Sequence, residues 1–138
     1  MKVFIDANVL VAVLNQEYPR FDLASRVLSL ADSKKFTIFT SSLAISISFY
    51  LSSKKSSDTV AYNKIKLLSK RIEIASNKSD DLERIFENKK IHDVEDGLQY
   101  FAALNSKNKV IITYDLNDFY FSDIEVLNPK DFLLKYAL

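Results

Sequence analysis

The chain begins with MKVFIDANVL, residues 1–10, in which a short apolar run leads directly into an acidic residue. Residues 3–5 are typical of a buried strand, and residues 8–14 continue as an apolar stretch that favours a helix packed on several sides. Asp6 stands between the two. Ligands of open α/β sheets bind at the carboxyl ends of the strands, so Asp6 is a candidate for chemistry.

The remainder of the chain alternates apolar strand-like runs with segments of helical periodicity. Further strands are expected at residues 36–40, 72–75, 110–113 and 125–127. Helices are expected at residues 21–32, 43–51, 59–68, 80–87 and 93–105, and after Pro129. This alternation predicts an α/β fold, a three-layer sandwich in which helices cover a mostly parallel central sheet. We expect a single domain over residues 1–138, because no stretch has the composition of a linker.

The composition excludes several classes of protein. The share of apolar residues is 48% and that of charged residues 27%, which is typical of globular proteins. The absence of cysteine excludes disulfides and thiolate metal sites, and a single glycine excludes Gly-rich phosphate loops. No leader pattern and no apolar run of roughly 18 residues is present, so we expect a cytoplasmic protein without a membrane span. The net charge of +1 does not by itself indicate a nucleic-acid partner.

Acidic residues follow two of the predicted strands and open one predicted helix. Asp6 follows the first strand, and Asp115 follows the strong strand late in the chain. In the helix at residues 93–105, Asp93 and Asp96 share a face with residues that should pack on the sheet. The carboxyl ends of parallel strands meet at one edge, so these carboxylates are expected to converge on one crevice.

Each of these acids also has a purely structural explanation. Asp6 can cap the helix that follows it, and Asp115 can be a turn residue. Asp93 and Asp96 have the spacing of a capping box. Neither caps nor turns explain why all of them should meet. Converging carboxylates would either have raised pKa values or require a compensating cation. Mg²⁺ or Mn²⁺ suits such oxygen ligands, and hydrolysis of phosphodiester bonds is the chemistry that the site favours.

Three segments together resemble the PIN domain family, which comprises metal-dependent ribonucleases and includes VapC-type toxins of bacterial toxin–antitoxin pairs. The segments are FIDANVL, HDVEDGLQYFAAL and IITYDLNDF, in that order, and the final NPKDFL resembles the closing segment of the family. The resemblance covers nearly the whole chain, and Asp118 matches a frequent family acid. It implies a PIN-like fold and a divalent-metal-dependent endoribonuclease, the toxin of a type II toxin–antitoxin pair.

The resemblance also implies site residues and partners. Asp6, Asp96 and Asp115 would hold Mg²⁺ or Mn²⁺ and act in catalysis. Asp93 would assist as a further catalytic acid, and Asn8 would be the polar neighbour of Asp6. The implied partners are an RNA substrate, a cognate antitoxin protein and a second copy of the chain in a homodimer.

One position departs from the family pattern. Many members carry a glutamate on the helix after the second strand, where this chain has Ile47. Isoleucine supplies no oxygen, although Ser46 or Ser48 would be able to order a water molecule nearby. The departure makes a second metal doubtful and leaves an alternative open, a catalytically weak or silent PIN-like module that binds RNA or a protein partner.

Two rival folds and several other features carry less weight. Dehalogenase-type phosphatases require a second aspartate where this chain has Asn8, and receiver domains require a lysine where it has Tyr114 and Asp115. His92, the sole histidine, is interpreted as a surface or capping residue. Lysine pairs would supply phosphate contacts only if they rimmed the crevice, and these pairs are Lys34/Lys35, Lys54/Lys55 and Lys89/Lys90.

Overall fold

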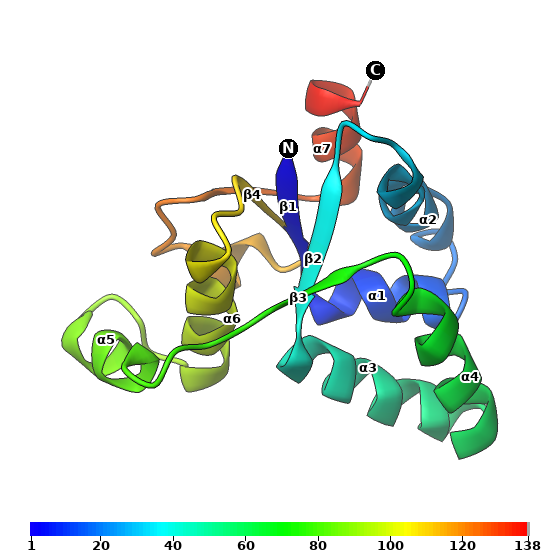
Figure 1. Cartoon of the computed structure of the whole chain (residues 1–138), viewed down its shortest axis with the longest axis horizontal. Coiled ribbons are helices and arrows are strands. Elements are labelled where there is room, and N and C mark those ends of the chain that lie inside the picture. The colour runs from blue at the N-terminus through cyan, green and yellow to red at the C-terminus, as the bar shows by residue number, and fades with distance from the viewer. Residues whose placement is uncertain (138) are drawn as a thin grey trace.

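A five-stranded parallel sheet lies at the centre of the computed structural model, which describes residues 1–137 (Figure 1). The strands are β1 (Lys2–Ile5), β2 (Thr37–Ser41), β3 (Glu73–Ala75), β4 (Val110–Ile112) and β5 (Glu125–Leu127). The helices are α1 (Ala7–Leu14), α2 (Phe21–Ser29), α3 (Ser42–Lys55), α4 (Asp58–Leu68), α5 (Asp81–Glu87), α6 (Val94–Asn105) and α7 (Pro129–Tyr136), with short 3₁₀ turns at Leu30–Asp32 and Leu116–Phe119.

The strand order is β3-β2-β1-β4-β5, with every neighbouring pair parallel. β1 lies in the middle, where Phe4 is paired with Phe39 of β2 and with Ile111 of β4. The chain winds outward from β1 in one direction through β2 and β3, and in the other through β4 and β5. The order therefore reverses between β1 and β4, which is the usual position of a ligand crevice in open α/β sheets.

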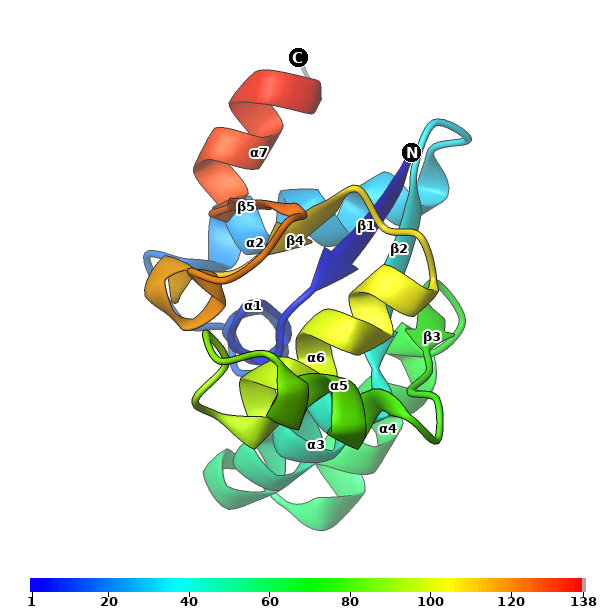
Figure 2. The same ribbon diagram turned by 90° about the vertical axis from the view of Figure 1, so that its left-hand side faces the viewer.

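Helices cover both faces of the sheet, as the sequence predicts (Figure 1, Figure 2). Val3 and Ile5 pack in a cluster with residues of α1, α2 and α7, whereas Phe4 packs in a second cluster with residues of α5 and α6. All three side chains are fully buried. A strand buried on both faces reads as a continuous apolar run, which explains the opening of the sequence.

Most predicted boundaries lie within two residues of the observed ones, and two helices differ. The helix predicted at 21–32 ends at Ser29 and tightens into the 3₁₀ turn, as helix ends commonly do. The helix predicted at 43–51 continues to Lys55, because Ser52 is buried and Lys55 Nζ donates to the carbonyl oxygen of Asn15. Within residues 1–137 no helix has both the length and the apolar character that crossing a bilayer requires.

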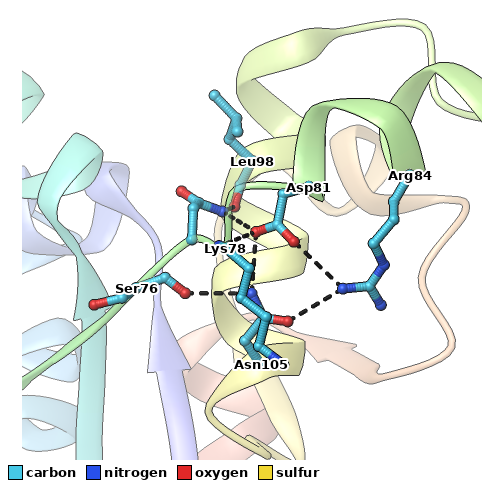
Figure 3. Close-up of polar contacts among 7 residues, drawn as sticks. Ser76, Lys78, Asp81, Arg84, Leu98 and Asn105 are labelled. Atoms are coloured by element: carbon cyan, nitrogen blue, oxygen red, sulfur yellow. Dashed lines mark hydrogen bonds and ion pairs between the residues drawn. The ribbon is translucent and has the colours of Figure 1, made fainter.

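A polar network around the buried Asp81 attaches α5 to α6 through Asn105 (Figure 3). Asp81, at 1% exposure, accepts hydrogen bonds from Asn77 Nδ2, Lys78 N, Asn105 Nδ2 and Arg84. Burial favours the neutral carboxyl, but these hydrogen bonds and the Arg84 charge together hold the pKa of Asp81 below its ordinary value. The network ties the β3–α5 loop to the far end of the helix that carries Asp96.

Gly97 allows α5 to approach α6 closely beside Asp96. A Cβ atom at Gly97 would lie 2.8 Å from Cγ1 of Ile85 and 3.1 Å from Cγ2 of Ile91. Both isoleucines are buried, so they have little room to move. The only glycine of the chain is thus placed where α5 and the following loop pack on the first turn of α6.

Candidate metal centre

A pocket of about 230 Å³ lies where β1 and β4 end and α6 begins. It is lined by carboxylates from three separate parts of the chain, which are Asp6 and Glu17, Glu95 and Asp96, and Asp115 and Asp118. Asp6 follows β1, Asp115 follows β4, and Asp96 belongs to the first turn of α6. The structure thus brings the three predicted metal ligands to one pocket at the switch point of the sheet.

Asp6 acts as a helix cap and also faces the pocket. Its backbone N–H donates to the carbonyl oxygen of Ile112 at 3.0 Å, which extends the pairing of β1 with β4. Its Oδ1 accepts from Ala7 N at 2.7 Å, and its Oδ2 accepts from Thr113 Oγ1 at 2.8 Å. Burial raises the pKa of Asp6 despite these two hydrogen bonds, and the charges of Asp115 and Asp118 raise it further.

Asn8 and Thr113 hold the two strand-end acids in a fixed relation. Asn8 Nδ2 donates to Thr113 Oγ1 and to Asp115 Oδ2, both at 3.1 Å. Asn8 Oδ1 accepts from Tyr114 N at 3.2 Å, and Thr113 Oγ1 accepts from Asp115 N at 3.0 Å. Asn8 was expected to be the polar neighbour of Asp6, and its hydrogen bonds connect it to Asp6 only through Thr113, which contacts both.

The carboxyl of Asp96 is also perturbed. Its pKa rises from 3.8 to about 7, first through burial and then through the charges of Asp118, Asp93, Asp6 and Glu95. The pKa of Asp118 is raised by the same causes, burial first and then Asp115 and Asp93. A bound cation would reverse this balance by favouring the ionised carboxylates.

Asp93 differs from the other predicted acids in its position. It is exposed, it does not line the pocket, and its Oδ1 accepts from Asp96 N at 3.0 Å as the N-cap of α6. Within the described residues the side chain of Asp96 returns no hydrogen bond to the backbone of Asp93, so only half of a capping box forms. Asp93 therefore stabilises the first turn of α6, and the side chain of Asp96 lines the pocket.

The acids line one pocket, but their carboxylates are not arranged around a common point where a metal ion would bind. Among residues 1–137, no three acidic or histidine side chains lie close enough together to enclose a metal ion as they stand. Hydrogen bonds occupy both oxygens of Asp6 and one oxygen of Asp115, and like charges keep the remaining carboxylates apart. The donor set itself, all oxygen with excess negative charge, suits a hard divalent ion such as Mg²⁺ or Mn²⁺. Binding would draw these carboxylates together.

An apolar wall stands opposite the acids. Ile47 of α3 lines the pocket with Leu51 and Val11, so the residue that departs from the family pattern does face the site. Ser46 and Ser48 do not line it, and the hydroxyl of Ser48 donates to the carbonyl oxygen of Ala44. The expectation that one of these serines orders a water at the site is therefore wrong, because Ile47 occupies the inward position on α3.

Gln99 and Arg20 are among the pocket residues that were not predicted from the sequence. Gln99, only 2% exposed, lines the pocket one turn after Asp96. The spacing of three residues on a helix could have indicated that Gln99 faces the same way as Asp96. Its Oε1 accepts a hydrogen bond from Ser41 Oγ, the cap of α3. Arg20 lines the pocket from the loop before α2, and nothing in the local sequence indicated this. None of the three lysine pairs lines the pocket.

Two comparisons of sequence place the chain among known proteins. A family model described as PIN domain matches residues 2–117. Ribonuclease VapC1 of Aquifex aeolicus (strain VF5) is 31% identical over 135 residues, which cover 95% of this chain and 92% of that protein.

Two solved structures share the fold. VapBC2 from Rickettsia felis, bound to a DNA fragment from its promoter, has a TM-score of 0.69 at 18% identity, covering 93% of this chain and 98% of that one. VapBC-1 from nontypeable Haemophilus influenzae has a TM-score of 0.70 at 15% identity, covering 94% and 99%. The family model spans most of the chain, and the VapC1 relative matches nearly all of it. The chain therefore belongs to the PIN domain family.

Proposed function

We propose that the chain is a divalent-metal-dependent endoribonuclease that hydrolyses RNA phosphodiester bonds and serves as the toxin of a type II toxin–antitoxin pair. The observation that carries the proposal is the pocket at the switch point, which the carboxylates of Asp6, Asp96 and Asp115 line together. Burial and neighbouring acids raise the pKa of Asp6 and of Asp96. The similarity to Ribonuclease VapC1 supports RNA as the substrate. A cytoplasmic location and a single domain over residues 1–138 are parts of the same proposal.

In this proposal Asp6, Asp96 and Asp115 hold one Mg²⁺ or Mn²⁺. Such an ion supplies Lewis acidity toward a phosphoryl oxygen and lowers the pKa of a water that attacks phosphorus. Thr113 and Asn8 keep the carboxylates of Asp6 and Asp115 oriented through their hydrogen bonds. Asp93 contributes to catalysis by capping the helix turn from which Asp96 extends.

The apolar wall supports a second candidate function, a catalytically weak or silent module that binds RNA or a protein. Ile47 faces the pocket and offers no ligand oxygen, which reduces the number of acids that can hold an ion. Cleavage of RNA that depends on a metal separates the two candidates, because only the enzyme requires it.

The deciding experiment measures cleavage of a structured RNA with Mn²⁺ and unfolding without metal, both on Asp6→Asn. Asparagine caps a helix about as well as aspartate, so the fold should survive. Loss of cleavage by orders of magnitude with unchanged or higher stability supports the ligand role of Asp6. Asp131→Asn, in the first turn of α7 outside the pocket, is the matched control. Cleavage by Asp6→Asn at the wild-type rate would refute the mechanism, and a wild type that binds RNA without cutting it favours the silent module.

We further propose that an antitoxin helix binds the groove between α2 and α4. This groove, about 610 Å³, is lined by apolar side chains such as Phe21, Leu28 and Leu67, with Lys64 and Lys70 among its polar residues. Its chemistry fits an amphipathic segment with acidic flanks. The solved structures with the same fold are VapBC proteins, which supports such a partner.

Co-expression with a small protein tests this surface, if one is encoded beside the gene. Leu67→Asp should abolish co-purification, whereas Leu134→Asp on α7, also an exposed leucine, should not. Equal co-purification of both variants would contradict the groove assignment.

We also propose that the chain forms a homodimer, for which the apolar helix α3 exposes Tyr50 and Leu51. Sedimentation at tens of micromolar should give a dimer, and a strict monomer would remove that proposal.

A further inference from the structure

Arg20 is the one cationic side chain among the described residues that line the acidic pocket. It precedes α2 as the residue at its N-cap, and it is exposed. The pocket carries six carboxylates, so its field repels the backbone of any nucleic acid that approaches. A phosphate that enters must therefore meet a compensating donor at the rim.

Tyr114 holds Arg20 at two points. The guanidinium carbon lies 4.2 Å from the centre of the Tyr114 ring, and Tyr114 Oη donates to the backbone carbonyl of Arg20 at 3.3 Å. Tyr114 itself packs against the core cluster and sits between Thr113 and Asp115 in the chain. Tyr114 thus fixes the position of Arg20 relative to Asp115, its neighbour in the chain.

The guanidinium of Arg20 is not used by any acid in the described part of the chain. The ion pairs within residues 1–137 join Arg71 to Asp32, Arg84 to Asp81, and Lys135 to Glu125. A guanidinium that lies over an aromatic ring and makes no ion pair keeps its N–H donors available to another acceptor. These donors match two oxygens of a phosphate.

We propose that Arg20 binds a backbone phosphate of the RNA adjacent to the bond that is cut, with Tyr114 as its support. The inference rests on the proposed ribonuclease function and adds a substrate-binding residue to it. The adjacent phosphate is favoured because Arg20 lies at the exposed rim and contacts none of the three metal-binding acids. The lysine pairs do not line the pocket, so Arg20 is the charge positioned for this contact.

A rival explanation gives Arg20 a purely structural role. Glu17 lies in the same loop and acts electrostatically on Tyr114, as does Arg20. If Arg20 served only to balance Glu17 and cover Tyr114, its removal would lower stability and leave RNA binding unchanged. The two roles therefore differ in the measurement that responds.

The experiment measures RNA binding by fluorescence anisotropy in an Asp6→Asn background, which prevents cleavage, between about 50 and about 250 mM KCl. Arg20→Gln should weaken binding about tenfold and reduce the slope of log K against log salt by about 0.7, the value of one single-strand phosphate contact. Arg20→Lys should recover part of the slope. Arg26→Gln removes an exposed charge from α2 outside the pocket and should change neither quantity beyond the effect of net charge.

Parallel measurements separate this inference from the function on which it rests. In the wild-type background, Arg20→Gln should raise KM about tenfold with kcat within about twofold, and Mn²⁺ should stabilise it as much as the wild type. Tyr114→Leu should change the salt slope in the same direction. Binding and slope equal to those of Arg26→Gln, or a loss of stability alone, would overturn the role of Arg20. A wild type that neither cuts nor binds RNA would refute the proposed function, and this inference with it.

Discussion

Replacing Asp96 with asparagine should stabilise the metal-free protein and remove most of its stabilisation by metal. The carboxyl of Asp96 keeps its proton up to about pH 7 in the folded state, because burial and neighbouring acids disfavour its charge. In the unfolded chain the same group ionises near its ordinary value of 3.8. The folded state therefore binds more protons between these values, so the free energy of unfolding falls as pH rises through this window.

The magnitude follows from the rise of the pKa. A change from 3.8 to about 7 corresponds to about 4 kcal/mol at about 1.36 kcal/mol per pH unit. Solvent screens this partly exposed carboxylate, which reduces the expected penalty to about 1–2 kcal/mol. The penalty is absent below pH 3.8 and complete above about pH 7. Asp96→Asn lacks it at every pH.

Urea denaturation in EDTA checks this at about pH 4.5 and about pH 8. Asp96→Asn should exceed the wild type by about 1–2 kcal/mol at the higher pH and by far less at the lower one. With Mn²⁺ at about 100 times its dissociation constant the wild type should gain about 2.7 kcal/mol, and the variant much less. Asp131→Asn controls for the loss of one charge outside the pocket. The proposed repulsion among the acids would be refuted if the wild type and Asp96→Asn showed parallel pH profiles of the free energy of unfolding and equal stabilisation by Mn²⁺.

Three further substitutions address the surroundings of the site. Ile47→Glu should restore an acid to the pocket, lowering the metal-free melting temperature and enlarging the shift produced by Mn²⁺; an unchanged shift would show that α3 plays no part in binding. Gly97→Ala should cost about 1–2 kcal/mol in urea denaturation, because Ile85 must move, and a gain from helix propensity alone would contradict the close packing. Asp81→Ala should cost about 2–4 kcal/mol in thermal unfolding, because it removes the buried acceptor of hydrogen bonds from Arg84 and two asparagines.

The sequence by itself determined the class of fold and the positions of the acids along the chain. The run at 3–5 is apolar at every residue because β1 is covered on both faces, and the alternation with helical segments then requires crossover connections and a parallel sheet. Asp6 and Asp115 follow β1 and β4, so their common edge was predictable. These features depend on periodicity and on which residues end a strand, which are local properties of the chain.

Periodicity and capping rules left two neighbouring acids equivalent, and the tertiary structure decided which of them faces the pocket and which caps the helix. Asp93 and Asp96 are three residues apart and chemically identical. Asp93 accepts the hydrogen bond that caps α6, whereas Asp96, next to the close packing of α5 on Gly97, lines the pocket. The assignment of Asp93 as a catalytic acid stays a prediction.

The structure also decided which other residues line the pocket and how the acids are held. Ile47 and Arg20 reach the pocket from α3 and from the loop before α2, and Arg20 does so through Tyr114, which is 94 residues away in the chain. Hydrogen bonds from Asn8 and Thr113 likewise hold the carboxylates apart in the absence of a cation. Such relations depend on sheet register and on packing between distant segments, whereas periodicity and capping act only within a few residues of each position.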